Sequence, residues 1–512
     1  MNSFVATFDV GTTSLKAALM SRDGALLHPQ SVSIDTWSND AGAVEQDPDQ
    51  WYRLFTGVAR EWWCRGIDPA SVQIIAMTGQ MQNLIALDRQ GAPVGRAILY
   101  SDLRASKEAD AVNLRFGKAA LRADVANPVT AGSLLPKLLF LREHEPERLA
   151  KTHRVLFGAK DYLINRLCGR SVCDWTTAST TGLLLARERV WHDAQLDSFG
   201  FTSALMPELS AADAIVGSIH DEAALATGFR SGTPVLCGIG DAAATALGAG
   251  VSGTHRPYVY VGTTGWVAQL VDASDLQRPV ADTVFTLCSW APDALMRIAP
   301  VLNAGNVLAW ALTLVGHQPG EDPERYFDLL EAEAGRMQSQ DQSEQSDGLM
   351  FVPFISPERC PVSTRSAHGS FIGISSQTTR AHMLHAIFEG LAQSLRWCGD
   401  LLDVSPDGEM TAIGGATRNT IFMQAMANAF GKTLHVKPDA DYLAAAGVAR
   451  LAARVLGWNE AAMEAGERGE LSNQKRSVAP NSERAVFLHR RFQHFQRIAT
   501  TVTSFTAESG LE

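Results

Sequence analysis

The sequence contains 512 residues, of which 46% are hydrophobic and 19% are charged, so its composition is that of an ordinary globular protein and its length favours two large domains over one core. Its 44 lysines and arginines are outnumbered by 55 aspartates and glutamates, which gives a net charge of −11. An acidic chain without a basic run is a poor binder of nucleic acid and of anionic membranes, so we expect neither as a partner.

Neither the N-terminus nor the cysteines indicate export. The first residues, "MNSFVATFDVG", lack the basic region and apolar core of a signal peptide. The apolar run 307–316 is too short to span a bilayer and predicts a buried helix. The seven cysteines are scattered without a C-x-x-C pair, which predicts reduced thiols rather than disulfides or a zinc site. We therefore expect a cytoplasmic protein.

Two distant segments share the same local pattern. The apolar run 4–10, "FVATFDV", leads into Gly-Thr-Thr and a second apolar run, and the segment 258–274, "YVYVGTTGWVAQLVDAS", repeats this order. The shared letters, V-G-T-T, occur at 10–13 and 261–264. This repeat predicts two halves that each open with a β-hairpin. Strand-like and helix-like segments alternate between the hairpins, which favours an α/β fold.

Several further elements follow along the chain. A helix is expected from Pro48, with Asp47 as its N-cap, and another over 159–168, closed by Gly169. The segment 444–457, "AAAGVARLAARVLG", predicts a helix of small residues that can approach a neighbour closely. The polar stretches 338–347 and 467–485 predict an exposed loop and a connector.

The Gly-Thr-Thr turns are candidates for phosphate binding. Glycine allows close backbone approach, and successive N–H groups and hydroxyls can donate to anionic oxygens. Asp9 stands inside an apolar strand, where a buried carboxylate needs a partner such as hydrated Mg²⁺. The alternatives remain open: each turn is a simple hairpin bend, and Asp9 bonds the turn at the strand end.

The segment 238–250, "GIGDAAATALGAG", holds one carboxylate, Asp241, among glycines and alanines. The preceding residues predict a buried strand and the following ones a tightly packed helix. Asp241 then lies at a strand–helix junction, where it is either the helix N-cap or a general base for an alcohol. The segment 414–419, "GGATRN", is a second close-approach turn after a strand. The P-loop pattern G-x-x-x-x-G-K-[ST] does not occur.

Ordered motifs along nearly the whole chain resemble the FGGY carbohydrate kinases, and within them the xylulokinases. They include "FDVGTTSLKAAL", "VEQDPDQWY" (44–52), "AILYSDLRA" (97–105), "PKLLFLREHEPE" (136–147), "GIGDAAATALGAG", "VGTTG", "GGATRN" and the long segment 369–389, "GSFIGISSQTTRAHMLHAIFE". The resemblance implies an α/β fold of two actin/hexokinase-like (ribonuclease-H-like) domains with a cleft between them. We expect these domains at 1–253 and 254–490, followed by a helix end and tail at 491–512.

The resemblance also implies roles for individual residues. Asp241 matches the catalytic base and, with Asp9, lies at the Mg²⁺ site. The residues expected to bind ATP are Gly11, Thr12, Thr13, Gly262, Thr263, Thr264, Gly414, Gly415 and Asn419. Those expected to bind the sugar are Gln80, Met81, Gln82, Asp102 and Asp241.

Three departures from the family pattern fall on the sugar side. Xylulokinases usually have G-Q-M-H-G where this chain has Gly79-Gln80-Met81-Gln82-Asn83, and W-N-D-G-R where it has Tyr100-Ser101-Asp102-Leu103-Arg104. Ala242 replaces the Asn that commonly follows the catalytic Asp. A site built on hydroxyl hydrogen bonds discriminates strongly when a partner is lost, so these departures bear directly on the choice of sugar.

The resulting hypothesis is an ATP- and Mg²⁺-dependent kinase that converts D-xylulose to D-xylulose 5-phosphate. One alternative is a kinase for another ketose or a sugar alcohol; glycerol is disfavoured because glycerol kinases typically carry Arg-Glu at the positions of Met81 and Gln82. From another class, the chain is a non-catalytic, actin- or Hsp70-like nucleotide-dependent protein or a sugar sensor. The expected partners are the sugar and ATP, and a homodimer is allowed.

Overall fold

The computed structural model describes residues 3–251, 253–318, 328–330, 332, 348–364, 366–437, 440–459 and 476–508. The predicted loop at 338–347 and the first part of the predicted connector at 467–485 lie outside these ranges. In the part of the chain that is described, no helix is long and apolar enough to cross a membrane.

The N-terminal half is built on a mixed sheet that has seven strands among the described residues. β1 (Phe4–Val10) and β2 (Ser14–Ser21) form the first predicted hairpin, and β6 (Val72–Gly79) runs parallel to β1 on its other side. The spatial order is β14 (Ile215–Ser218), β15 (Pro234–Leu236), β6, β1, β2 and β3 (Leu26–Ser33), with β16 (Ile239–Gly240) also paired to β6.

The C-terminal half repeats this arrangement. β17 (Pro257–Val261) and β18 (Gly265–Asp272) form the second predicted hairpin, and β23 (Glu409–Ile413) runs parallel to β17 as β6 does to β1. The described order is β19 (Phe285–Cys288), β20 (Ala294–Val301), β18, β17, β23, β24 (Thr433–Lys437) and β25 (Arg476–Val478). The α/β fold of two similar actin/hexokinase-like halves is therefore confirmed.

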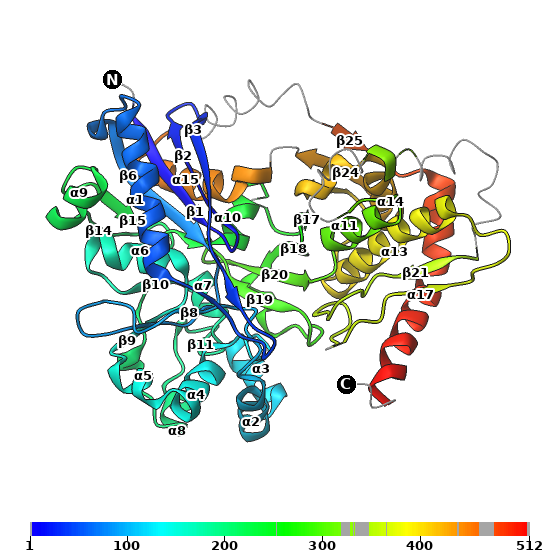
Figure 1. The fold of residues 1–512 in the computed structure, drawn as a ribbon, viewed down its shortest axis with the longest axis horizontal. Helices are drawn as coiled ribbons and strands as arrows, with labels where there is room; N and C mark the ends of the chain where they lie inside the picture. Colours follow the sequence, from blue (N-terminus) through cyan, green and yellow to red (C-terminus); the bar gives the residue numbers. More distant parts are fainter. Residues whose placement is uncertain are drawn as a thin grey trace.

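Helices cover both sheets, and one helical layer is shared between them (Figure 1). The outer face of the first sheet packs against α1 (Pro48–Cys64), α6 (Ala159–Cys168) and α9 (Asp221–Thr227). The outer face of the second packs against α11 (Gly305–Thr313), α13 (Arg380–Leu401), α14 (Thr420–Phe430) and α17 (Ser482–Glu508). The shared layer consists of α10 (Asp241–Gly248) and α15 (Leu443–Val455). The predicted N-cap Asp47 and the terminating Gly169, in the left-handed region, are both confirmed.

An insertion in the N-terminal half carries a separate hydrophobic cluster and reaches the second sheet. Asn127 forms hydrogen bonds in both directions with the backbone of Thr286, and Arg122 donates to the carbonyls of Ala281 and Val284. Its main elements are β7 (Ile85–Leu87), β8 (Ala97–Ile98), α2 (Ser106–Phe116), α3 (Lys118–Val125), α4 (Leu134–His144), α5 (Pro146–Lys151), β9 (Arg154–Leu156), β10 (Val172–Asp174), α7 (Trp175–Ser179), β11 (Leu184–Leu185), β12 (Val190–Trp191), α8 (Asp193–Ser198) and β13 (Glu208–Ser210). Short strands complete the fold: β4 (Trp37–Ser38), β5 (Val44–Gln46), β21 (Met350–Val352) and β22 (Ser370–Ile372).

The small residues of α10 and α15 bring the two helix backbones into contact. A Cβ atom on Gly248 would lie 1.8 Å from the carbonyl oxygen of Leu443, and one on Gly447 would lie 1.9 Å from that of Ala244. Thr7 of β1 also donates to the carbonyl of Ala445 at 2.6 Å. The predicted close approach of the helix at 444–457 is confirmed, and its neighbour is the helix that begins at Asp241.

Gly447→Ala is expected to lower the free energy of unfolding by about 1–3 kcal/mol, because the added methyl group forces apart two backbones that cannot move independently. Urea unfolding followed by circular dichroism measures the change. Gly57→Ala in α1 is the matched control, since its Cβ meets nothing within 4 Å, and it should stabilise by about 0.5–1 kcal/mol. Equal effects at the two glycines would contradict the close-packing argument.

Candidate active site

Three parallel strands of the first sheet end at the same edge. Val10 of β1 pairs with Gly79 of β6, and Gly79 pairs with Gly240 of β16. The residues that follow these strand ends therefore meet. They are the Gly-Thr-Thr turn at 11–13, the loop at 80–83 and Asp241, so this edge brings together the predicted base, one predicted phosphate turn and part of the predicted sugar site.

Asp9 points toward the shared layer rather than toward the outer helices. Strand alternation places it on the face of Val5, which packs in the cluster formed by both sheets. Its Oδ1 is buried and has no hydrogen-bond partner among the described residues. Burial raises the pKa of Asp9 to about 6, and Lys16 on the adjacent strand partly offsets this. A buried carboxylate oxygen without a donor is a suitable position for a cation.

Asp241 is the first residue of α10, so the N-cap interpretation is wrong: Gly240 occupies the N-cap and makes no side-chain capping bond. Asp241 Oδ1 instead accepts from the adjacent Ala242 N–H at 2.8 Å. Burial raises the pKa of Asp241 to about 7, and the negative charge of Asp9 adds to this shift. A carboxylate whose pKa lies near neutrality is suited to accept a proton from an alcohol.

The strand predicted before Asp241 is interrupted. β15 and β16 are separated by Cys237 and Gly238, and Gly238 has a φ of 69°. A Cβ atom there would lie 1.9 Å from the carbonyl oxygen of Met77, so only glycine permits this approach. The break bends the chain so that Asp241 leaves the sheet at the edge where β1 and β6 end.

The threonine carbonyl groups of the first Gly-Thr-Thr turn are hydrogen-bonded to the protein, whereas two of its N–H groups have no acceptor among the described residues. Thr12 accepts from Gln46 Nε2 at 2.6 Å through its carbonyl, and Thr13 accepts from the N–H of Ile34 at 2.9 Å. Gly11 donates to Ser14, which closes the hairpin. Within the described ranges, the N–H groups of Thr12 and Thr13 donate to no protein acceptor. They are therefore available to an anion.

The second Gly-Thr-Thr turn also has hydrogen-bonded carbonyls and two N–H groups without an acceptor in the described part of the chain. Gly262 donates to the carbonyl of Thr264, while the carbonyls of Gly262 and Thr263 accept from Gly305 and Asn306 at the start of α11. The N–H groups of Thr263 and Thr264 have no acceptor among the residues that the structure describes. Both threonines are exposed, so this turn offers a second pair of donors.

The turn at 414–419 lies beside the second Gly-Thr-Thr turn. Gly414 has a φ of 107°, and a Cβ atom there would lie 2.4 Å from the carbonyl oxygen of Val261. Gly415 is exposed, and a Cβ atom there would meet nothing within 4 Å. Asn419 caps α14 through its Oδ1, while its buried Nδ2 has no partner among the described residues. This turn combines open space with an unused donor.

The loop at 80–83 follows β6 at the same edge, and its side chains differ in how far they are buried and hydrogen-bonded to protein. Gln80 is 1% exposed, and its side chain donates to Gln46 and accepts from Thr12. Met81 covers Gly240, whose Cβ would lie 2.0 Å from the Met81 sulfur. Gln82, at φ 62°, donates to the Thr180 carbonyl, and its Oε1 accepts no hydrogen bond from any described residue. Gln80 is thus engaged in the protein, Met81 is half-buried, and Gln82 is 8% exposed with one side-chain oxygen that accepts no hydrogen bond from a described residue.

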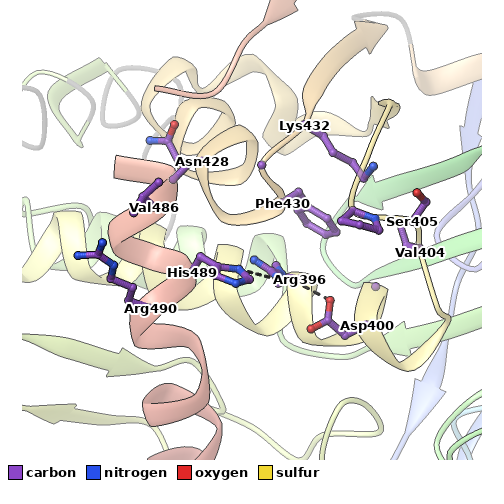
Figure 2. Close-up of a pocket in the computed structure, with 14 residues that line it drawn as sticks. Arg396, Asp400, Val404, Ser405, Asn428, Phe430, Lys432, Val486, His489 and Arg490 are labelled. Atoms are coloured by element: carbon purple, nitrogen blue, oxygen red, sulfur yellow. Dashed lines mark hydrogen bonds and ion pairs between the residues drawn. The ribbon is translucent and has the colours of Figure 1, made fainter. Parts of the chain in front are cut away.

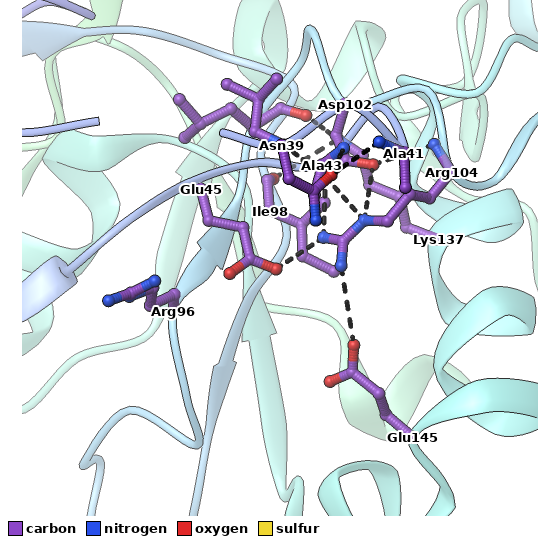
Figure 3. Close-up of polar contacts among 12 residues, drawn as sticks. Asn39, Ala41, Ala43, Glu45, Arg96, Ile98, Asp102, Arg104, Lys137 and Glu145 are labelled. Atoms are coloured by element: carbon purple, nitrogen blue, oxygen red, sulfur yellow. Dashed lines mark hydrogen bonds and ion pairs between the residues drawn. The ribbon is translucent and has the colours of Figure 1, made fainter. Parts of the chain in front are cut away.

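Asp102 is buried in an ionic network (Figure 3). Its Oδ2 accepts from the Val44 N–H at 2.9 Å and from Arg104 Nη2 at 2.7 Å, and its Oδ1 accepts from the Arg104 backbone at 3.0 Å. Arg104 also pairs with Glu45 at 2.6 Å. Leu103, between them, is 60% exposed. Both carboxylate oxygens of Asp102 are therefore already engaged.

Three aromatic residues at this site were missed from the sequence. The rings of Tyr260 and Trp266 stack with centroids 4.2 Å apart, and Trp266 donates to the hydroxyl of Tyr258, which donates to the Ala242 carbonyl. Burial raises the pKa of Tyr260 to about 12, with smaller contributions from Asp9 and Asp241. The signal was present: the second hairpin carries tyrosine and tryptophan, which have polar atoms, around its Gly-Thr-Thr turn, whereas the first carries only phenylalanine.

Gln46 and Lys137 were also missed, because each is a single polar residue whose partners lie elsewhere in the chain. Gln46 links Thr12, Thr36, Gln80 and Trp51. The buried ammonium of Lys137 donates to the carbonyls of Gln82 and Leu99 at 2.8 and 2.9 Å. These contacts fix the loops of the predicted sugar site, and the sequence pattern of an isolated Gln or Lys does not reveal them.

A cavity of about 410 Å³ lies elsewhere, on the outer face of the C-terminal half between α13, α14 and α17 (Figure 2). Its main charged groups are engaged with the protein: Arg396 contacts Asp400, His489 and the Ala429 carbonyl, and Lys432 donates to the Asp407 carbonyl. It contains none of the predicted site residues, so we assign it no part in the site at the strand ends.

Comparison with known proteins agrees with this arrangement. Residues 4–248 match the N-terminal domain, and residues 258–456 the C-terminal domain, of the FGGY family of carbohydrate kinases. The xylulose kinase of Streptomyces rubiginosus is 30% identical over 466 residues, 90% of this chain and 89% of that protein. The xylulose kinase of Staphylococcus xylosus is 26% identical over 440 residues, covering 85% and 88%. The gluconate kinase structure from Lactobacillus acidophilus superposes with a TM-score of 0.85 at 23% identity, covering 98% and 99%.

Proposed function

The chain belongs to the FGGY family of carbohydrate kinases, and we propose that it transfers the γ-phosphate of ATP to a hydroxyl group of D-xylulose. One observation carries the assignment of the site: Asp241, with a pKa of about 7, stands at the strand edge beside Asp9 and a Gly-Thr-Thr turn. Relatives named as xylulose kinases that align over most of their length support the choice of sugar.

In this proposal Asp241 accepts the proton of the attacking sugar hydroxyl. As the bond between the γ-phosphorus and the β–γ bridging oxygen breaks and ADP leaves, the sugar oxygen forms the new P–O bond and its proton passes to Asp241. The free N–H groups of Thr12, Thr13, Thr263 and Thr264 bind the phosphate oxygens from the two halves of the protein. Together they favour the charge that develops during transfer.

The nucleotide and the metal have separate positions. Gly414 and Gly415 let the adenosine lie against the backbone, and the unused Nδ2 of Asn419 donates to it. The buried, unpartnered Oδ1 of Asp9 fits Mg²⁺, which Asp9 and Asp241 would hold. When bound, Mg²⁺ supplies positive charge to the phosphate oxygens.

In this proposal the sugar lies against Met81 and Gln82 on one side and the stacked rings of Tyr260 and Trp266 on the other. Gln80 and Asp102 remain part of the sugar site in a different way. Since both are buried and hydrogen-bonded to protein, they position the 80–83 and 100–105 loops rather than bind hydroxyls directly.

Turnover measured against a panel of sugars tests the proposal. Purified protein with ATP and Mg²⁺ is assayed for ADP release with D-xylulose, other ketopentoses and ketohexoses, sugar alcohols and gluconate. The highest kcat/KM is expected for D-xylulose. A higher value for a sugar alcohol or another ketose would select the alternative kinase, and nucleotide binding without sugar-dependent ADP release would select the non-catalytic, actin-like alternative.

Gln82→His is expected to raise kcat/KM for D-xylulose relative to the other sugars by about 2- to 10-fold, the contribution of one hydrogen bond. Histidine tolerates the positive φ of this position and restores the family's usual residue. The same panel measures the ratio, since specificity is a ratio of kcat/KM values. Ala242 is left unchanged because it is buried in the shared core. An unchanged ratio in the variant would exclude Gln82 as a determinant of selectivity, and a lower ratio would show that glutamine rather than histidine favours D-xylulose at this position.

The Asp9→Asn/Asp241→Asn variant is expected to be more stable than the parent at pH 8 without Mg²⁺ by about 1–3 kcal/mol, allowing for partial solvent screening. The folded-state pKa values, about 6 and 7, lie above the ordinary 3.8. The folded parent therefore holds extra protons between about pH 4 and 7, and its free energy of unfolding falls as the pH rises through this window.

Urea unfolding at pH 5 and pH 8 measures this difference, which should be smaller at pH 5. Mg²⁺ should stabilise the parent and leave the double variant unchanged, because only the parent offers carboxylates. A stability difference that is the same at both pH values would contradict the carboxylate pair as its cause.

A further inference from the structure

Outside the kinase site, a buried carboxylate oxygen in the insertion lacks a partner. Glu108 lies in the first turn of α2 and is 7% exposed, and its Oε2 has no hydrogen-bond partner among the described residues. α2 packs against α4, and the two helices lie side by side (Figure 1). An ionised carboxylate in this position needs a positive charge nearby.

The end of α4 presents two further ligand groups to Glu108. His144 Nε2 lies 3.8 Å from Glu108 Oε1. Glu143 is adjacent, and one ligand atom from each of the three residues lies within 4.8 Å of the others. Glu143 and His144 are exposed, so the cluster is closed on the side of Glu108 and open to water on the other. The His144 ring also packs on Phe140, with centroids 4.6 Å apart, which restricts its orientation.

We propose that Glu108, Glu143 and His144 bind a divalent transition-metal ion of the Zn²⁺ type, which joins α2 to α4. One imidazole nitrogen and two carboxylate oxygens, completed by water from the open side, form a four-coordinate set that Zn²⁺ accepts. Ligand atoms bound to one Zn²⁺ at about 2.0–2.2 Å lie closer together than in this cluster, so small rotations of the exposed side chains complete the site.

The ligand set separates this ion from the Mg²⁺ of the kinase reaction. Mg²⁺ prefers oxygen ligands and near-ideal octahedral geometry, whereas an imidazole favours Zn²⁺ and its neighbours in the first transition series. A second cluster in the described residues, His255 with Asp272 and Asp275, has a similar composition but no buried unpartnered oxygen. It provides an internal control for metal binding by exposed groups.

The site adjoins the loop that carries Asp102. Phe140, on which His144 packs, lies under the Arg104 guanidinium at 5.1 Å, and Arg104 pairs with Asp102. Glu145, the residue after His144, lies 4.0 Å from Arg104 (Figure 3). A metal that fixes the end of α4 therefore also restrains Arg104, which holds Asp102 and its loop in place. This role goes beyond phosphoryl transfer itself.

Zn²⁺ binding to the full-length, chelator-treated protein tests the site, in buffer without nucleotide or Mg²⁺. Isothermal titration and metal analysis after gel filtration are expected to give one tight equivalent. His144→Ala and Glu108→Gln should weaken its binding by at least about tenfold, while His255→Ala and Asp9→Asn should retain it. The exposed His144 provides a variant that folds even if Glu108→Gln does not, and circular dichroism verifies both.

Absence of a tight equivalent in the parent would overturn the proposal. So would an equivalent that His144→Ala retains, or one that is lost in His255→Ala or Asp9→Asn, since these results would place the ion at the exposed cluster or at the kinase site. Activity with D-xylulose does not enter this measurement, so a failure of the metal site and a failure of the proposed kinase function are distinguishable.

Discussion

Asp241→Asn is expected to lower kcat by about 10²- to 10⁴-fold, the usual contribution of a general base, while the Kd for ATP stays within a few-fold of the parent value. Asparagine keeps the shape of the side chain and an acceptor oxygen for the Ala242 N–H. It cannot take the proton of the sugar hydroxyl. The loss should therefore fall on kcat and kcat/KM together.

Single-turnover kinetics with saturating ATP, together with calorimetric titration of ATP, separate the chemical step from nucleotide binding. Asp213→Asn is the matched control, because Asp213 is exposed, and it should leave kcat unchanged. Near-normal turnover of Asp241→Asn with a purified sugar would assign the carboxylate a structural role at the start of α10 and require another base.

The parts of the fold that were predictable depend on residues close together in the chain. Each hairpin follows from an apolar run, a Gly-Thr-Thr turn and a second run, and helix ends follow from local signals such as Asp47 and Gly169. The meeting of Asp241 with the first turn was predicted only through family resemblance. Its physical cause is the pairing of β1, β6 and β16, which joins residues more than 150 positions apart.

What the sequence did not predict depends on how buried polar groups are satisfied. Gln80 and Asp102 match a sugar-binding motif, but their hydrogen bonds go to protein atoms. The partners, Gln46 and Val44, precede them by 34 and 58 positions, and no local pattern marks such a pair. Gly240, and not Asp241 as the sequence suggested, is the N-cap of α10, and its contact with Met81 follows from the pairing of β6 with β16.

Lys160→Met is expected to lower the free energy of unfolding by about 3–5 kcal/mol, the usual effect of removing one partner from a buried ionic cluster. Lys160 lies 2.6 Å from Asp161 and 3.2 Å from Asp174, and all three side chains are buried. Burial lowers the pKa of Lys160, but the two carboxylates outweigh it and hold the pKa well above its ordinary value. The lysine is therefore a permanent cation that both aspartates require.

This cluster also supports the strand edge from which Asp241 follows. A Cβ atom on Gly238, which precedes β16 and Asp241, would lie 3.5 Å from Lys160 Cδ, and Asp161 and Asp174 cap the starts of α6 and α7. Without the cation, the Asp161 and Asp174 carboxylates face each other without compensation. Since burial already raises the pKa of Asp161, the variant should relieve the repulsion by taking up a proton there.

The loss of stability in Lys160→Met should therefore be larger at pH 8 than at pH 5, because the folded variant binds an extra proton that the unfolded chain releases. Urea unfolding at the two pH values measures both losses, and Lys151→Met, at an exposed position, should change stability by less than about 0.5 kcal/mol. A loss that is independent of pH would indicate a packing defect left by the shorter side chain. A loss that grows with pH would instead show that Lys160 stabilises the protein by compensating the charges of Asp161 and Asp174.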